Sequence, residues 1–385
     1  LAKTFSLAVG QWDSFELFYE QSYRVLKSGG YWSFIIPRPS LSSENYEPLR
    51  IHWLKNAELC LVGDAGMPFP EVGVESIIPV VRKGGQAQYI GAHRVSSEGY
   101  AYIGKLPNEV CQSLPFHTIP LGISSAEATV IAAMQRGSTR LGKTITLVRG
   151  IEAGKDAPFI VKRPCNGCVP LGFGEDLQRY FYQTDHWVRR CDDDLKTFKP
   201  TSLYDQPRKL LIRRVGAELV ASIDIHRSNV LNTIYVAKLK TGEGRDISFL
   251  CALINSRLLG FWFKRVFLFE DRLFPYARVS QLSWLPIRRI AFVTPIAERA
   301  KLAEEGKHLY REALERATLT DSARELFSNL LTFVEERLKK IHKPDPELVR
   351  KHNANPLNKD WQIPEGALWE QSDVVHDLLA FLAEE

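Results

Sequence analysis

Helix and strand signals alternate over the first 85 residues, and this order constrains the fold of the segment more than any other feature. The first run of apolar residues at helical spacing stops at Gly29-Gly30, as expected for a helix with a glycine past its C-terminus. The predicted helices cover 15–26 and 47–56, and the predicted strands cover 31–36, 58–62 and 74–81. Because helices alternate with strands, we expect crossover connections and a mostly parallel sheet. Three or four strands make half of a doubly wound α/β domain.

Residues 86–292 are less regular, but they carry the positive charge of the chain. Strand-like runs at 144–148, 210–214, 219–223 and 233–239, with a helix at 247–263, predict a mixed α/β domain. The segment holds 29 Lys/Arg and 18 Asp/Glu, an excess of +11, whereas residues 1–85 sum to −1 and residues 293–385 to −5. This pattern suggests a polyanionic partner, although scatter about neutrality would produce it about as often.

Residues 293–385 read as helical. Thr294-Pro295 predicts a capped helix with proline at its first position, and apolar residues then recur to Leu314. A second helix over 323–341 has its apolar residues on one face. We expect the two helices to form an antiparallel pair, and four prolines in 344–364 predict a loop.

Composition argues against several other classes of protein. No uninterrupted apolar run approaches the roughly 20 residues that cross a bilayer, so no membrane partner is expected. Six cysteines in 385 residues do not make a disulfide scaffold, which favours a cytoplasmic location. Residue 1 is a leucine and the last residues still read as helix, so we expect both ends to lie inside a longer protein.

Residues 26–37 read Leu-Lys-Ser-Gly-Gly, then an apolar strand and a proline, and Pro48-Leu49-Arg50 follows. This pattern resembles the carboxyl-terminal half of the catalytic domain of amino-group DNA methyltransferases. Six motifs further on resemble, in the same order, the TaqI-like specificity domain attached behind such catalytic domains. They lie at 147–155, 174–180, 209–213, 221–224, 252–258 and 285–287.

The resemblance implies three regions. Residues 1–85 would be part of a Rossmann-like methyltransferase sheet, residues 86–292 a mixed α/β target-recognition domain, and residues 293–385 a helical segment. A catalytic half followed by a recognition domain is the order of the adenine-N6 branch, so the implied parent is a site-specific adenine methyltransferase of a restriction-modification or antiphage system. Its cofactor would be S-adenosylmethionine and its partner double-stranded DNA, with other restriction-modification domains or subunits as further partners.

The family's glycine-rich cofactor loop and Asn-Pro-Pro-Tyr motif are absent from the sequence, and we expect them upstream of Leu1. The chain alone is therefore expected to be inactive, with no cofactor-binding residue of its own. The rival hypothesis is a non-catalytic specificity subunit that works with separately encoded methyltransferase or nuclease partners. A third hypothesis is a protein-interaction scaffold built on the terminal helices.

The resemblance also suggests individual site residues. Phe69, in a turn before the last strands of the catalytic sheet, is the candidate for stacking on a flipped target base; the alternative is a loop phenylalanine packed on its own domain. Candidates for DNA contact lie in or beside the motifs, although each is also explained by a structural role. They are Arg149, Lys155, Arg179, Tyr180, Arg213, Arg214 and Arg257. We expect Asn255-Ser256 to be a structural hydrogen-bonding element, and an acid of 174–176 to hold Arg179 as readily as Arg179 contacts DNA.

Two other patterns partly match a metal site and a nuclease motif. Cys165 and Cys168, with His186 and Cys191, have the spacing of a zinc site, but a tight turn with two reduced thiols is favoured, and no metal is predicted. Asp345 and Glu347 begin a nuclease-like pattern, but the acidic-x-lysine strand does not follow. No nuclease is therefore expected within the 385 residues.

Overall fold

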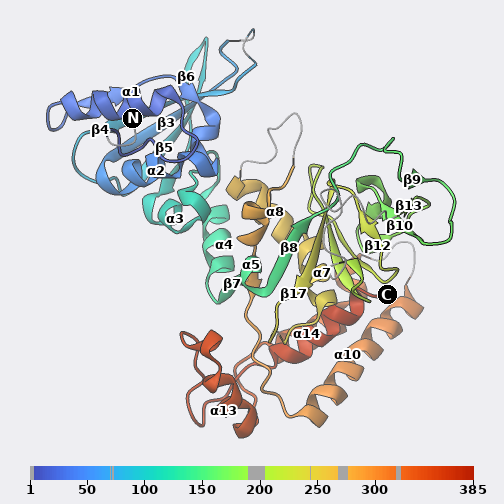
Figure 1. Cartoon of the computed structure of the whole chain (residues 1–385). Helices are drawn as coiled ribbons and strands as arrows, with labels where there is room; N and C mark the ends of the chain where they lie inside the picture. Colours follow the sequence, from blue (N-terminus) through green and yellow to red (C-terminus); the bar gives the residue numbers. More distant parts are fainter. Residues whose placement is uncertain are drawn as a thin grey trace. The chain divides into compact units, whose positions relative to one another are not determined.

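The computed structural model describes residues 4–69, 71, 73–189, 204–242, 244–267, 276–317 and 322–385. The fold is mixed α/β, as expected, and it divides into two compact units (Figure 1). The first unit comprises Leu1–Ser138 with Gly260–Pro275 and Trp284–Pro286, and the second comprises Thr139–Leu259, Tyr276–Ser283 and Ile287–Glu385.

The first unit is built on a six-stranded sheet with the order β1-β4-β3-β5-β6, in which β2 also pairs with β4. Its strands are β1 (Tyr31–Ser33), β2 (Ile36–Pro37), β3 (Glu58–Gly66), β4 (Ser76–Arg82), β5 (Tyr89–Ser96) and β6 (Gly99–Pro107). The expected mostly parallel sheet is wrong, because only β3 and β5 are parallel. Among the described residues no helix lies between β3 and β4 or between β5 and β6, and each following strand returns antiparallel to its predecessor.

Two details of the strand prediction also change. The run at 31–36 is split between β1 and β2, and Phe34 and Ile35 at the break are 45% and 43% exposed. Strand β3 continues through Gly66, beyond the end of the strand predicted at 58–62. Because β5 pairs with β3, the division expected after residue 85 falls inside this sheet.

Helices close one part of this unit around a buried arginine. Arg50 has no exposed surface, and its guanidinium donates to the carbonyl oxygens of Phe116 (2.9 Å), Ser40 (2.7 Å) and Ser43 (2.7 Å). Arg50 of the Pro-Leu-Arg motif therefore anchors the chain of its own unit. The helices are α1 (Ser14–Val25), η1 (Arg38–Leu41), η2 (Glu44–Tyr46), α2 (Glu47–Ile51), η3 (His52–Asn56), α3 (Asn108–Ser113), η4 (Pro115–His117) and α4 (Ser125–Gln135).

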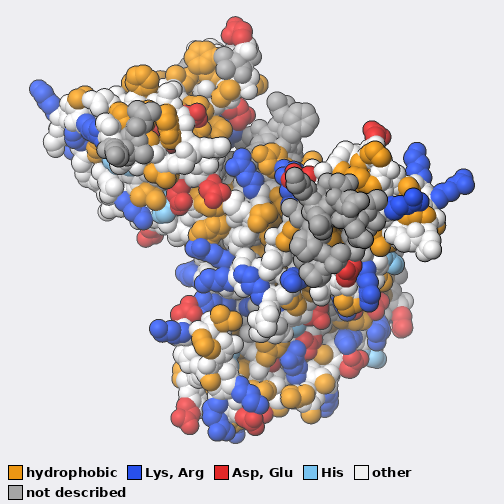
Figure 2. Space-filling view, viewed as in Figure 1, with side chains coloured by type: hydrophobic (Ala, Val, Ile, Leu, Met, Phe, Trp, Pro, Cys, Tyr) orange, Lys and Arg blue, Asp and Glu red, His pale blue; other side chains and the backbone are white. Residues whose placement is uncertain are grey.

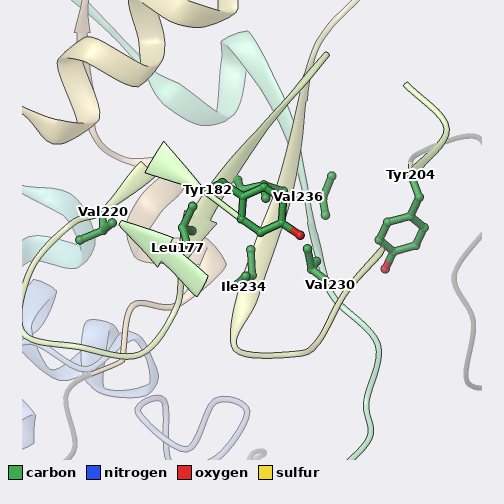
Figure 3. Close-up of a cluster of buried hydrophobic side chains, with 8 residues drawn as sticks. Leu177, Tyr182, Tyr204, Val220, Val230, Ile234 and Val236 are labelled. Carbon is green, nitrogen blue, oxygen red and sulfur yellow. The ribbon is translucent and has the colours of Figure 1, made fainter. Parts of the chain in front are cut away.

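The second unit contains an antiparallel four-stranded sheet with the order β15-β14-β17-β8. The strands are β8 (Ile145–Arg149), β14 (Lys209–Arg213), β15 (Ala221–Asp224) and β17 (Ile234–Leu239). All four strand-like runs predicted in the middle segment therefore meet in one sheet. Beside it, Leu177, Tyr182, Tyr204, Leu211, Val220, Val230, Ile234 and Val236 form a buried cluster (Figure 3).

Smaller strands complete this part of the unit. A second sheet has the order β16-β10-β13-β9, and β11 and β12 form a hairpin. The bounds are β9 (Ile160–Val161), β10 (Cys168–Gly172), β11 (Leu177–Gln178), β12 (Phe181–Tyr182), β13 (Trp187–Arg189) and β16 (Asn229–Val230), with the single-turn helix η5 (Gly174–Asp176) before β11. Near the unit boundary β7 (Ser138–Arg140) pairs with β18 (Pro286–Arg288), followed in the chain by α5 (Leu141–Thr144); α9 is Val279–Ser283.

The helix predicted at 247–263 is two helices, α7 (Ile247–Asn255) and α8 (Arg257–Phe267). Ser256 between them has an extended backbone conformation (ψ 144°), which ends α7. Within the described residues no single helix is long and apolar enough to cross a membrane, and only this bent pair reaches that length and hydropathy. Most of α7 is buried inside the unit.

The C-terminal segment is helical, as expected, and packs on the rest of its unit: α14 contacts both α7 and α10, and α10 contacts α12. The helices are α10 (Ile296–Arg316), α11 (Ala323–Leu326), α12 (Ser328–Arg337), α13 (Pro346–Ala354), η6 (Pro356–Asn358) and α14 (Ser372–Leu382). Thr294 does not cap α10, because its hydroxyl donates to Asp373 (2.6 Å).

The loop predicted at 344–364 is wrong, because it contains α13. Pro346 and Pro356 stand at helix starts, where the missing N–H group is tolerated, and Pro344 and Pro364 lie outside the helices. Asp345 caps α13 by accepting from the backbone N–H groups of Glu347 (2.8 Å) and Leu348 (3.2 Å), and Glu347 pairs with Lys351 (2.8 Å). Both acids of the nuclease-like pattern therefore stabilise this helix, Asp345 as its N-cap and Glu347 as an ion-pair partner.

Candidate nucleic-acid interface

Three of the arginines predicted to contact DNA lie at one end of the β15-β14-β17-β8 sheet. Arg213 ends β14, Arg214 follows it, and Arg149 ends β8. In the register of the sheet Arg213 is opposite Ile234 and Arg149 is opposite Tyr235, both at the start of β17. Because β17 is antiparallel to both neighbours, the carboxyl ends of β14 and β8 lie at the same end of the sheet.

A short segment, residues 276–278, packs onto this end. The Tyr235 hydroxyl donates to the carbonyl of Ala277 (2.9 Å), and the N–H of Ala277 donates to the carbonyl of Arg214 (2.9 Å). The Tyr276 ring centre lies 5.0 Å from the guanidinium carbon of Arg214 and 5.8 Å from that of Arg278, within the range of cation–π attraction. We name this group the arginine edge: Arg149, Arg213, Arg214, Tyr276 and Arg278.

Most guanidinium donors of the edge are weakly engaged within the described residues. Arg213 donates to the carbonyl of Leu177 at 3.5 Å and Arg214 to that of Asn232 at 3.4 Å, both at the long limit of a hydrogen bond. Arg149 pairs with Glu152 (2.9 Å), whose side chain is 64% exposed. The Nε atoms of Arg149 and Arg213 are buried without a hydrogen-bond partner among the described residues. The edge therefore holds unused donors, the feature that an anion or a base edge would satisfy.

Arg179 and Tyr180 form the turn of the β11–β12 hairpin. Tyr180 has a left-handed backbone (φ +63°), its N–H donates to the carbonyl of Ala221 in β15 (3.0 Å), and its side chain is 48% exposed. Partial burial raises the pKa of the Tyr180 hydroxyl, so this hydroxyl keeps its proton at neutral pH. Arg179 pairs with Glu218 (2.7 Å), whereas Asp176 accepts from the N–H of Phe173 (2.8 Å). The acid that holds Arg179 is therefore Glu218 and not one of the acids of 174–176.

Lys155 and Arg257 do not belong to the arginine edge. Lys155 donates to both carboxylate oxygens of Glu175 (2.7 and 2.6 Å) and lies 5.5 Å from the Phe173 ring centre. Such an exposed pair contributes about 0–1 kcal/mol, so a phosphate could replace the carboxylate at small cost. Arg257 is the exposed first residue of α8.

Asn255 has the structural role expected of it. Its Oδ1 accepts from the N–H of Ala221 (2.9 Å) and its Nδ2 donates to the carbonyl of the same residue (2.8 Å). The side chain is 4% exposed, so it ties the end of α7 to the first residue of β15. The carbonyl and the NH2 group of the Asn255 side chain are thus both used inside the domain, and their bonds fix the distance between the end of α7 and the sheet.

Phe69 lies in the first unit, in the connection between β3 and β4. Its side chain is 49% exposed, which is compatible both with a stacking role and with partial packing on its own domain. The stacking role stays a prediction.

The Cys165–Cys168 turn is confirmed, but the expectation of two reduced thiols is wrong in this structure. Gly167 has a left-handed backbone (φ +76°), which brings the two Cα atoms to 5.1 Å and allows the disulfide that joins them. Cys191 lies outside the described residues. Among those described, no group of three or more His, Cys, Asp or Glu side chains is arranged to hold a metal ion.

Tyr276 and Arg278 were not found from the sequence. They belong to a stretch without helical or alternating periodicity, and only the packing of 276–278 on the sheet end makes them part of the edge. The only local signal is the Tyr-Ala-Arg sequence, which places an aromatic and a basic side chain two residues apart.

Comparison with known families identifies the part of the chain that carries the edge. Residues 169–287 match the model of the TaqI-like C-terminal specificity domain. This confirms the resemblance stated for the middle motifs over most of their length. The matched segment covers less than half of the chain, and it includes Arg213, Arg214, Tyr276 and Arg278 but ends before the C-terminal helices.

Solved structures of restriction-modification enzymes resemble the chain over nearly its whole length. They include the type IIG restriction endonuclease BpuSI (12% identity, 98% of this chain and 49% of that chain, TM-score 0.33). The type IIL enzyme MmeI in complex with DNA gives 9% identity, coverage of 97% and 53%, and a TM-score of 0.42. The DrdV–DNA complex has 10% sequence identity to the chain; the match covers 99% of this chain and 52% of that chain, with a TM-score of 0.41. The chain spans about half the length of these proteins, and at these TM-scores the likeness carries no argument about function.

Proposed function

We propose that this chain recognises a specific sequence in double-stranded DNA through its TaqI-like specificity domain. The observation that carries the proposal is the arginine edge, where Arg149, Arg213 and Arg214 at the ends of two strands meet the segment that carries Tyr276 and Arg278. All of these residues except Arg149 lie inside the matched range 169–287. Arginine suits both parts of the task, because it pairs with backbone phosphate and binds the guanine edge bidentately. Arg179 and Tyr180, on the hairpin tied to β15, extend the surface.

The edge also has the rigidity that base recognition needs. Arg214 is held between its backbone bond to Ala277 and the Tyr276 ring, and burial raises the pKa of Tyr235, which keeps the proton that it donates to Ala277. A guanidinium held in this way loses little side-chain freedom on binding. Arg149 and Arg213 bring donors that have no partner in the described residues.

We further propose that the parent is an adenine-N6 DNA methyltransferase of a restriction-modification or antiphage system. The edge strand of the first unit supports this proposal. Strand β1 lies at the end of the sheet order, and Tyr31, Phe34 and Ile35 on and beside it are 63%, 45% and 43% exposed. An apolar edge strand is normally covered or paired, so further strands would fit there. S-adenosylmethionine would be held by such further parts of the protein, with Phe69 as this chain's contribution to the reaction.

The test begins with selection of a preferred duplex from a random pool by the full chain. Arg213→Ala and Arg214→Ala should then weaken the selected site by about 1–3 kcal/mol each if they read bases, while affinity for unrelated DNA falls less. Lys301→Ala, an exposed charge on α10, is the matched control and should bind as the wild type does. Selection of no preferred sequence, or wild-type affinity in both arginine variants, would contradict the proposal. Methylation by the intact parent separates an enzyme from a specificity subunit.

A further inference from the structure

A cavity of about 760 Å³ lies in the second unit, away from the arginine edge. One wall is α5 with the loop around Gly242 and Gly244, and the other is the segment from Lys351 to Trp361. Thr144, in the wall, immediately precedes β8, whereas Arg149 of the edge ends that strand. The cavity and the edge therefore lie at opposite ends of β8.

The lining is strongly basic. Among its described residues are five Lys or Arg side chains and one carboxylate, Asp360. Asp360 is already paired with Arg289 (2.7 Å), and its hydrogen bond to Arg289 with the nearby charge of Lys143 lowers the pKa of this carboxyl. Lys351 pairs with Glu347, but both side chains are more than 60% exposed, so that pair is weak. The space thus has a net positive charge, and Figure 2 shows Lys and Arg side chains gathered over α5.

Thr144 contributes a buried polar atom to the wall of this space. Thr144 is 1% exposed and lines the cavity, and its hydroxyl has no hydrogen-bond partner in the described part of the chain. A buried hydroxyl without a partner costs about 1–3 kcal/mol, which a ligand oxygen would recover. This observation is independent of the charge count, and it indicates a polar ligand rather than a solvated basic surface.

Aromatic and apolar side chains complete the opposite wall. Trp361 stacks near Arg289, whose guanidinium carbon is 5.8 Å from the ring centre, and contacts the ring of His352 (5.0 Å). His352 is fixed by contacts with the carbonyl of Trp361 (3.0 Å) and with Asn358 (3.1 Å), and burial lowers its pKa, so it is neutral at pH 7. Phe292 also lines the space. This wall offers planar groups to a planar ligand.

We propose that the cavity binds a small phosphorylated ligand of the nucleotide class, independently of DNA recognition at the arginine edge. Lys143 and Arg289 would hold the phosphate, the Thr144 hydroxyl would bond a polar atom of the ligand, and the base would lie against the aromatic wall. The volume lies in the range of small-molecule sites, which commonly measure about 300–1,000 Å³. A backbone phosphate of a duplex can be bound at a flat surface, whereas this space is a partly open cavity.

The test uses the full chain and measures heat of binding and melting temperature with AMP, ATP and inorganic phosphate. A nucleotide should bind and raise the melting temperature, and Lys143→Met should weaken its binding at least tenfold. Thr144→Val removes the hydroxyl alone and should weaken binding several-fold without lowering the melting temperature of the unliganded protein. Lys301→Met is the matched control for charge and should bind the nucleotide as the wild type does. Arg214→Gln should also leave nucleotide binding unchanged.

Duplex binding, measured in parallel, separates the two possible sources of phosphate. If Lys143→Met weakens the duplex complex and no nucleotide binds, the cavity is a DNA contact and the proposal is overturned. Absence of binding by every nucleotide at millimolar concentration, or full binding by Lys143→Met, also overturns it. Because duplex affinity is recorded with the same samples, failure of DNA recognition at the edge is distinguishable from failure of this proposal.

Discussion

Glu16 shows how burial changes the protonation of a single side chain in this protein. It is fully buried in α1; its Oε2 accepts from the N–H of Asp13 (3.0 Å), and its Oε1 has no partner among the described residues. Burial raises the pKa of Glu16 from 4.5 to about 7. The protonated form is thus favoured in the folded state, and its contribution to stability is complete below about pH 4.5 and is lost as the pH rises through 7.

Glu16→Gln should therefore stabilise the chain above pH 7, by up to about 3 kcal/mol, because a neutral amide avoids the buried charge. Glutamine can also keep the capping interaction with Asp13. Urea unfolding of both proteins at pH 5 and pH 8 measures the effect. The gain should shrink toward pH 5; an equal difference at both values would mean that ionisation of Glu16 is not its cause.

Phe69 connects one residue to the proposed reaction. In the intact parent, Phe69→Ala should lower the single-turnover methylation rate roughly ten- to hundredfold, because a flipped base loses about 1–3 kcal/mol of stacking. Site affinity should change little, since the proposed base contacts lie in the specificity domain. Phe69→Trp is the control and should retain much of the rate. A wild-type rate in the alanine variant would remove Phe69 from the mechanism.

At the scale of elements, a buried ion pair shapes the turn after β15. Lys209 and Asp224 have no exposed side-chain surface and are paired, and Lys209 also donates to the carbonyl of Tyr204 (2.9 Å). Asp224 accepts in addition from the N–H groups of His226 (2.8 Å) and Ser228 (2.8 Å). The pair thus joins two neighbouring strands and holds the turn that leads to β16.

Lys209→Met should lower the free energy of unfolding by about 3–5 kcal/mol, because it leaves the Asp224 charge buried without its partner. The double variant Lys209→Met/Asp224→Asn removes both charges and should be less destabilised than the single variant. Denaturant unfolding of the wild type and the three variants, including Asp224→Asn, gives the coupling between the two sites. Equal losses in the single and double variants would show that the charge is not the cause.

At the scale of the whole molecule, charge is unevenly distributed along the chain. Residues 86–292 hold 29 Lys/Arg against 18 Asp/Glu, although the net charge of the protein is only +5. If four cations of the specificity domain contact phosphates, the logarithm of DNA affinity should fall with the logarithm of salt concentration with a slope of about −3.6. Titrations between 50 and 200 mM salt measure the slope, and a flat response would contradict phosphate contact.

The chain by itself should not methylate DNA and should bind S-adenosylmethionine no better than background, because the cofactor loop of the resembled family is absent from its sequence. Calorimetric titration of the purified chain with the cofactor is the measurement. Micromolar binding would refute this expectation and place a cofactor site within these residues.

The sequence by itself determined the features that depend on local pattern. Short apolar runs predicted the four strands that form the β15-β14-β17-β8 sheet, and helical spacing predicted α1 and α10. The helix predicted over 323–341 is divided into α11 and α12, and Leu331 and Ile341 of its predicted apolar face are exposed. The order of the middle motifs indicated a resemblance that agrees with the match of residues 169–287 to the TaqI-like C-terminal specificity domain, and the candidates for DNA contact were taken from those motifs. The double hydrogen bond of Asn255 was anticipated because a polar residue ending an apolar helix needs partners.

Tertiary structure decided what depends on contacts between distant residues. The direction of β3, β4 and β6 is set by pairing, so a helix–strand order could not show that the first sheet is mostly antiparallel. Tyr276 and Arg278 become part of the arginine edge only through the bonds of Ala277 to β14 and β17. The basic cavity likewise joins α5 to Trp361, more than 200 residues later in the chain. Local periodicity reports which face of an element is buried, whereas a site is made by the long-range packing that brings several elements together.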